Sequence, residues 1–333
     1  MGRVSVEGFL EMKIEMSRRF LTALIIYVLC GALVLACFAS ASAAFDSPDK
    51  GKDATTKPAP LPFEPSEELI YQGEFSRLLL RGIEIVEFRF TSARTNTQTA
   101  TAINAPAPAS ANTPQFLFKG DAKAKGWFRK LFGIDFHFVM ESVVDPDSFA
   151  VLSTNKLDEQ GKRVRTSVAV FDRANDKITW TERNPNDPQS RPKIVSSPLG
   201  GATHDFMSAI YYLRTRPLAV GQNFEIVLSD GGKVFPLPIK VVEKKMLKTV
   251  LGKKTPTLRV DIEAFGDQRL LPRQGQMTLW LTDDARRLPV RARIDTDLGT
   301  VEIKLKSVSP PSSKIKVQSS KSYSTFSTLN FEP

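Results

Sequence analysis

The feature that most constrains the fold of this chain is a series of short segments in which apolar and polar residues alternate. In residues 83–90, Phe88 and Phe90 lie on either side of Arg89, and this pattern recurs in residues 136–144, 163–172, 177–182, 223–230, 257–265, 275–283, 289–297 and 300–308. A period of two is typical of β-strands. Turn-forming residues separate the segments, so neighbouring strands should be antiparallel. The sequence therefore predicts a mainly β fold, a curled antiparallel sheet or barrel-like meander.

Two stretches depart from the alternation and predict helical structure. Residues 203–216 predict one packed α-helix, with Thr203 as its cap, Asp205 in its first turn and Pro217 after its end. Its apolar residues follow the spacing of a buried face, namely Phe206, Ala209, Ile210 and Leu213. Residues 122–132 predict a short helical turn with a one-sided apolar face formed by Trp127, Phe128, Leu131 and Phe132.

The composition along the chain indicates a single β-rich domain over residues 67–308. Residues 44–66 are polar and rich in proline, which predicts a flexible linker. Residues 91–114 have a similar composition and predict a disordered loop inserted between two strands. Residues 309–333 are rich in serine and lysine and predict a low-complexity tail. The remaining chain is long enough to build one sizeable core.

The N-terminal segment has the layout of a secretory signal. An apolar run over residues 20–39 follows Arg18 and Arg19, and residues 41–43 form an A-x-A exit site. Cleavage after Ala43 would remove both cysteines of the chain, Cys30 and Cys37. Two alternatives stay open. The run is long enough to span a bilayer as a retained anchor, and residues 34–37 resemble a lipobox in which Cys37 is lipidated. All three predict an exported protein, periplasmic or attached to the envelope.

The charge balance is basic, with 46 Lys and Arg against 36 Asp and Glu and a formal net charge of +10. Excess positive charge favours a lipid or an anionic envelope polymer as partner, and scattered surface charge is the alternative. Two clusters stand out: Lys119, Lys123, Lys125, Arg129 and Lys130, and then Lys244, Lys245, Lys248, Lys253 and Lys254. The first is interleaved with aromatic residues that could touch a membrane, and the second surrounds an expected hairpin turn. No aromatic RNA-binding motif is present, so no nucleic-acid partner is expected.

The sequence offers no recognisable catalytic, cofactor or metal site. The two histidines, His137 and His204, are far apart in the sequence, and no G-x-S-x-G motif accompanies them. Zinc sites need three or four ligands, and phosphate loops and dinucleotide fingerprints are absent. The carboxylate pairs at residues 145 and 147 and at residues 283 and 284 lie in turn sequences. We therefore expect no catalytic residue, no cofactor and no metal.

Candidate structural or ligand-contact residues gather on the predicted helix. Asp205, Tyr211, Tyr212 and Arg214 are polar or amphipathic, and Trp280 lies on a predicted strand. We expect Arg214 to form a buried ion pair with Asp283 or Asp284 that fastens the helix to the sheet. The alternative is that Arg214 or Tyr212 lies at a cavity mouth and binds an anionic headgroup.

At this helix the chain resembles a known family. Residues 205–226 resemble the helix and turn of the bacterial domain of unknown function 3108 family, and residues 69–90, 129–149 and 279–294 fit the same family in order. The resemblance covers roughly residues 69–308. Residues 78–82, Leu-Leu-Leu-Arg-Gly, depart from the small turn that is frequent in the family, and so does the insertion at 91–114. The resemblance implies an exported β-rich fold, and it implies no activity and no catalytic residues.

Together these patterns favour a non-enzymatic envelope protein that binds a lipid-like or other apolar ligand in a curled sheet. One alternative is a scaffold that assembles the envelope or contacts a wall or membrane surface, and a second is a hydrolase. The structure can discriminate among them. A carrier should contain an apolar cavity, a scaffold should have a filled interior, and a hydrolase should place a histidine beside a serine and a carboxylate.

Overall fold

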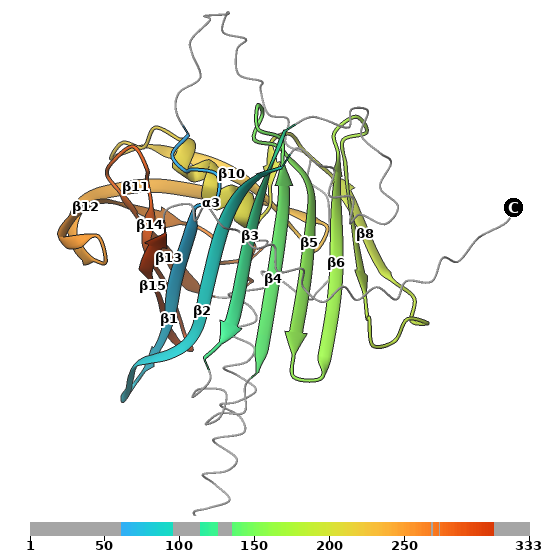
Figure 1. Ribbon diagram of the computed structural model, residues 1–333, viewed down its shortest axis with the longest axis horizontal. Helices are drawn as coiled ribbons and strands as arrows, with labels where there is room; N and C mark the ends of the chain where they lie inside the picture. The colour runs from blue at the N-terminus through green and yellow to red at the C-terminus, as the bar shows by residue number, and fades with distance from the viewer. Residues whose placement is uncertain (1–60, 96–113, 126–134, 268, 273, 310–333) are drawn as a thin grey trace, which may run out of the picture.

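The computed structural model describes residues 61–95, 114–125, 135–267, 269–272 and 274–309, which form one curled sheet and one helix (Figure 1). The described strands make a 15-stranded sheet in the order β8-β7-β6-β5-β4-β3-β2-β1-β15-β14-β13-β12-β11-β10-β9. Neighbours are antiparallel except β9, which pairs with β10 in parallel. The predicted fold class, a mainly β curled antiparallel sheet, is confirmed.

The strands divide into two runs that meet where β1 pairs with β15. The first run comprises β1 (Glu68–Arg77), β2 (Leu80–Thr95), β3 (Gln115–Ala124), β4 (Phe136–Val144), β5 (Val151–Gln160), β6 (Arg163–Asp172), β7 (Lys177–Arg183) and β8 (Lys193–Pro198). The second run comprises β9 (Thr203–His204), β10 (Asn223–Asp230), β11 (Lys233–Thr249), β12 (Gly252–Ile262), β13 (Gly275–Thr282), β14 (Pro289–Thr296) and β15 (Gly299–Ser309).

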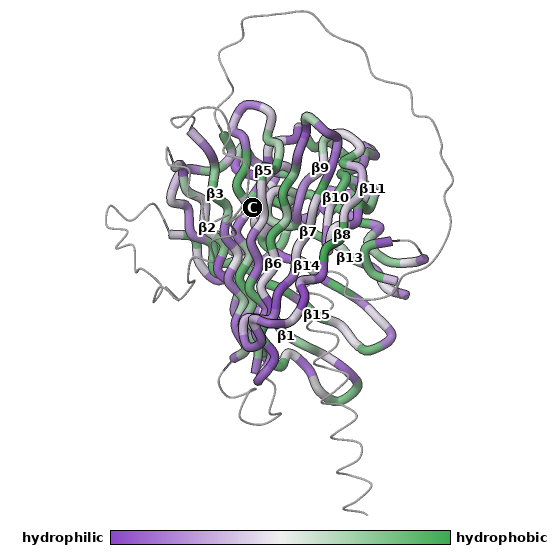
Figure 2. The backbone as a smooth tube through the Cα atoms, turned by 90° about the vertical axis from the view of Figure 1, so that its right-hand side faces the viewer, coloured by the Kyte–Doolittle hydropathy of each residue, from purple (hydrophilic) through white to green (hydrophobic). Residues whose placement is uncertain are grey.

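The sheet curls far enough that its two ends approach each other. The turn between β10 and β11 lies against β7 and β8, where a Cβ on Gly232 would come within 2.9 Å of the side chains of Trp180 and Val195. Gly232 has a positive φ of 76°, so this turn needs a glycine for its conformation as well as for space. Hydrophilic and hydrophobic residues alternate along the tube in Figure 2. The apolar side of this alternation therefore faces the inside of the curl.

The helix α3 (Phe206–Thr215) lies between β9 and β10 in the chain and contacts β3, β4, β9 and β10. It begins in a capping box, because the Asp205 carboxylate accepts from the Ser208 amide while the Ser208 hydroxyl accepts from the Asp205 amide. The predicted bounds of 203–216 and the predicted cap at Thr203 were wrong. Thr203 and His204 instead extend the sheet as β9, which pairs with Val227 and Leu228 of β10.

Three segments that we predicted to be a helical turn, a loop and a linker belong in part to strands or to the core. Residues 122–124, expected to begin a helical turn, continue β3, because pairing with both β2 and β4 outweighs the helix propensity of alanine and lysine. Residues 91–95 of the expected loop belong to β2. The expected linker is wrong at its end, since Phe63 is buried in the core. The signal over 1–43 with Cys37, and residues 44–60, 96–113, 126–132 and 310–333, lie outside the described residues.

Within the described part of the chain, no helix combines the length and the apolar character needed to cross a bilayer.

Candidate functional site

The concave side of the sheet and α3 enclose an apolar cavity of about 170 Å³. The sheet contributes aromatic and aliphatic side chains from both runs, including Phe88, Phe138, Met140, Ile226 and Leu279. The two runs bring these residues together because β1 and β15 join them at the centre of the sheet. The cavity therefore lies on the concave side of the curl.

One face of α3 forms the wall of the cavity opposite the sheet. Phe206, Ala209, Ile210 and Leu213 all line the cavity, and these are the four residues that the helical spacing grouped on one face. We predicted that this face packs on the sheet. The structure shows this packing at Leu213, which is 3 % exposed and belongs to a core cluster with residues of β10 to β13, whereas Phe206 keeps 38 % of its surface exposed. An apolar helix face that is only partly covered is the arrangement expected where a ligand completes the packing.

The other face of α3 packs against aromatic residues of the core. Tyr211 stacks on Phe118 with ring centroids 4.0 Å apart and meets Phe63 edge-on at 5.1 Å. Met207 lies over Gly120 of β3, where a Cβ would come within 2.7 Å of the Met207 sulfur. Glycine at this position lets the helix approach the sheet closely. The helix is thus held by aromatic packing at Tyr211, while Met207 packs on β3 and also lines the cavity.

Polar character enters the cavity lining through an ion pair between Lys156 and Asp230. Asp230 is buried, and this burial raises the pKa of its carboxyl to about 6 although the ammonium of Lys156 opposes the shift. The two residues also border a small second pocket that contains Thr154 and Asp205. The cavity therefore has a mainly apolar wall with a few charged residues, to which Asp121 and Arg291 also belong, and such a lining suits an amphipathic ligand.

The predicted ligand-contact residues lie around the cavity and do not line it. Asp205 caps α3 and accepts a short hydrogen bond from the Thr154 hydroxyl. Tyr212 stacks on the ring of His204 with centroids 4.3 Å apart. Trp280 is buried, with the Arg291 guanidinium 5.9 Å from its ring centroid. These contacts give Asp205, Tyr211, Tyr212 and Trp280 roles in packing, whereas the cavity-lining pair Lys156 and Asp230 was not predicted.

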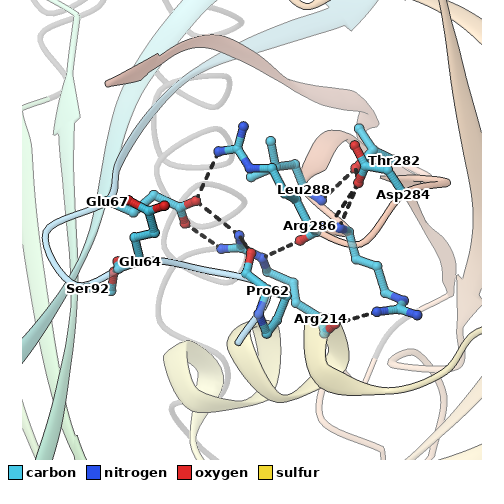
Figure 3. A network of polar contacts seen from close by, with 10 residues as sticks. Pro62, Glu64, Glu67, Ser92, Arg214, Thr282, Asp284, Arg286 and Leu288 are labelled. Carbon is cyan, nitrogen blue, oxygen red and sulfur yellow. Dashed lines mark hydrogen bonds and ion pairs between the residues drawn. The ribbon is translucent and has the colours of Figure 1, made fainter. Parts of the chain in front are cut away.

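Arg214 fastens the helix, as one reading of the sequence predicted, but its partner is Glu67 (Figure 3). Its Nη1 and Nη2 donate to the two Glu67 carboxylate oxygens at 2.6 Å and 3.1 Å. Further donation reaches the carbonyl oxygens of Pro62 at 2.7 Å and Arg286 at 3.1 Å. Arg214 has no exposed surface, so its guanidinium makes these hydrogen bonds inside the protein.

The predicted partners Asp283 and Asp284 were wrong. Asp284 accepts from the Thr282 hydroxyl at 2.6 Å and from the amides of the following turn, and Asp283 pairs with Lys244 at 2.8 Å. Both carboxylates are therefore used locally. Glu67 lies 147 residues before Arg214 in the chain and directly follows the expected linker. No local sequence spacing could therefore have identified Glu67 as the partner of Arg214.

The remaining candidates make local contacts. His137 lies between Glu159 at its Nδ1 (2.9 Å) and Asp121 at its Nε2 (3.2 Å). His204 is buried, which lowers its pKa to about 4. Lys119, Lys123 and Lys125 each pair with a carboxylate, so the first basic cluster is neutralised along its described part. No three described His, Cys, Asp or Glu side chains converge to hold a metal ion.

Comparison with protein families finds one match, to the family described as protein of unknown function (DUF3108), over residues 86–306. The chain belongs to the DUF3108 family. The matched range begins in β2 and ends in β15, so it contains α3 and every cavity-lining strand except β1.

This DUF3108 chain is also similar to a solved structure, a β-barrel-like protein of domain of unknown function DUF1849 from Brucella abortus. The two share 11 % sequence identity with a TM-score of 0.47, and the match covers 73 % of this chain and 97 % of the other. A comparison with curated proteins finds no match.

Proposed function

We propose that this protein holds an apolar, lipid-like ligand in the cavity beneath α3. The observation that carries this proposal is the helix face of Phe206, Ala209, Ile210 and Leu213, which borders an apolar cavity and is left partly exposed at Phe206. Leaving apolar surface without contacts forfeits dispersion energy and burial. A ligand that fills the space would restore both contributions.

The cavity volume sets the size of the bound group. Dry apolar cavities of about 150 Å³ bind benzene-sized molecules, and the present cavity measures about 170 Å³. This size suits one end of an acyl chain. The Lys156–Asp230 pair in the lining would then lie near a polar part of the ligand.

Holding, and not transforming, is the role that this wall supports. The described lining residues include no serine, threonine, cysteine or histidine, and the lining carboxylate and amine of Asp230 and Lys156 are paired with each other. The N-terminal signal layout supports a role outside the cytoplasm, and we propose that the protein acts in the bacterial envelope. A lipid carrier of the envelope is therefore our proposal, in preference to a scaffold with a filled interior or a hydrolase.

Filling the cavity from the helix should abolish ligand binding. Ala209→Phe places a ring in the space that Ala209 now borders. We expect the affinity for the apolar fluorescent probe N-phenyl-1-naphthylamine to fall at least tenfold, because an occupied cavity cannot take the probe. The measurement is a fluorescence titration of the two proteins, with circular dichroism to verify that the β fold is retained.

Ala219→Phe is the matched control, because it makes the same change at an exposed turn residue that does not line the cavity. Its affinity should equal that of the unaltered chain. Equal probe binding by all three proteins would contradict the proposed site.

A further inference from the structure

The hairpin end between β1 and β2 carries two leucines almost entirely in solvent. Leu78 is 87 % exposed and Leu79 is 98 % exposed, and the exposed arginines Arg77 and Arg81 flank them. We call residues 77–82 the leucine tip. Single exposed apolar side chains are common on protein surfaces. The leucine tip differs from this common case, because it has two adjacent exposed leucines between two arginines at the end of a projecting hairpin.

The backbone of the leucine tip argues against a folding role for these leucines. Leu78 has a φ of 51°, in the left-handed region that favours glycine or asparagine and disfavours bulky residues. Its side chain is exposed, so packing within the domain does not offset this conformational cost. An unfavourable residue held where it gains nothing from the fold points to a contact outside the chain.

A second hairpin end has the same combination of apolar and basic side chains. Residues 244–254, which we call the lysine tip, join β11 to β12 and contain five lysines and no acidic residue. Met246, Val250 and Leu251 are exposed among these lysines. The tip projects beyond the sheet, because β13 pairs with β12 only from Thr257 onward. Except for Lys244, which pairs with Asp283, its lysines form no ion pair with any described residue.

In Figure 1 the β1–β2 hairpin ends at the lower left and the β11–β12 hairpin at the far left. Exposed apolar residues within a ring of basic ones match the boundary of an anionic bilayer. The apolar side chains enter the acyl region while the basic groups contact the headgroups. The basic charge of the whole chain, +10, acts in the same direction.

We propose that the leucine tip and the lysine tip together dock this protein on an anionic lipid bilayer. This inference is independent of the cavity, since none of the described residues of either tip lines it. A surface that is both apolar and basic distinguishes this partner from an uncharged protein surface. It also distinguishes it from a soluble polyanion, which would need only the lysines.

Local fluorescence from the tips tests the docking. Leu79→Trp and Leu251→Trp each place one reporter at a tip, and Ile194→Trp places one at a residue of β8 that is 60 % exposed. Each full-length protein is mixed with vesicles of phosphatidylglycerol and phosphatidylcholine that carry brominated acyl chains, which quench tryptophan on contact. The unaltered chain supplies the background of the native tryptophans. Any contact through the N-terminal segment is common to all variants.

We expect quenching at positions 79 and 251 and none at 194, only with phosphatidylglycerol present, and weakened by 0.5 M salt. Lys253→Gln with Lys254→Gln in the Leu251→Trp chain should raise the lipid concentration at half-quenching by about 30-fold, since each lysine near an anionic surface contributes independently. Absence of quenching at the tips, or equal quenching at all three positions, would overturn the proposal. So would a concentration-dependent spectral shift of the tip reporters without vesicles, because it would identify a second copy of the chain as the partner.

Discussion

Arg214→Met is expected to lower the free energy of unfolding by about 3–5 kcal/mol, because it removes the two-point partner of the buried Glu67 carboxylate and leaves it only the half-exposed guanidinium of Arg286, at 3.3 Å. Glu67 is 4 % exposed, and water cannot replace the guanidinium there. The carbonyl oxygens of Pro62 and Arg286 lose their donor in the same variant. For a domain of this size, the loss corresponds to a fall in melting temperature of about 6–20 °C. Urea denaturation followed by circular dichroism measures the free energy.

Two further variants separate the buried pair from general effects of losing an arginine. Arg216→Ala removes an exposed arginine two residues further on and should cost less than about 1 kcal/mol. Glu67→Gln combined with Arg214→Met should recover part of the lost stability, because the double variant no longer buries a carboxylate whose main partner is missing. A loss for Arg214→Met no larger than that for Arg216→Ala would show that the network does not hold the helix.

Phe63→Ala is expected to destabilise the protein by about 3–5 kcal/mol, the usual cost of truncating a buried aromatic residue. Phe63 meets Phe116, Phe118 and Tyr211 edge-on, with ring centroids 5.1 to 5.5 Å away. The substitution therefore removes one ring from the cluster that supports α3. Thermal unfolding of the variant measures the effect.

Leu61→Ala is the control for Phe63→Ala, because Leu61 lies two residues earlier and is exposed. It should change stability by less than about 0.5 kcal/mol. If both variants lost the same small amount, residues 61–67 would be a loose attachment and not part of the core.

Residues 61–67 explain why part of the fold was out of reach of sequence reasoning. Their composition is polar and rich in proline, which is typical of a linker, yet Phe63 and Glu67 are buried. Of these seven residues, Phe63 and Glu67 fix the position of the segment. Both contact residues of α3, which is distant in the sequence. Local composition reports the average of a segment, whereas long-range contacts depend on single side chains.

The strands were predictable because alternation is a local signal. β4 shows a perfect alternation of buried and partly buried residues over Phe136–Val144, and the sequence pattern there predicted it. Order in the sheet also followed, since short turns join neighbours. The junction of β1 with β15 required the structure, because it links the two ends of the domain.

The candidate site was half predictable. The helical spacing identified the face of Phe206, Ala209, Ile210 and Leu213, but spacing cannot say whether such a face meets side chains or a cavity. Lys156 and Asp230 gave no signal, since each lies at an ordinary position of a strand and they are 74 residues apart. Pairs of this kind become visible only when the curl of the sheet brings the strands together.

Native mass spectrometry of the protein released from the envelope of the cells that produce it tests the central claim most directly. The account predicts a chain that begins at Ala44 and carries an additional mass, which dissociates on activation as a lipid-like molecule and is absent from Ala209→Phe. A protein that retains residues 1–43 would contradict the proposed cleavage alone. A protein that carries no ligand under the gentlest conditions, or the same ligand with Ala209→Phe, would contradict the claim that the cavity beneath α3 holds it.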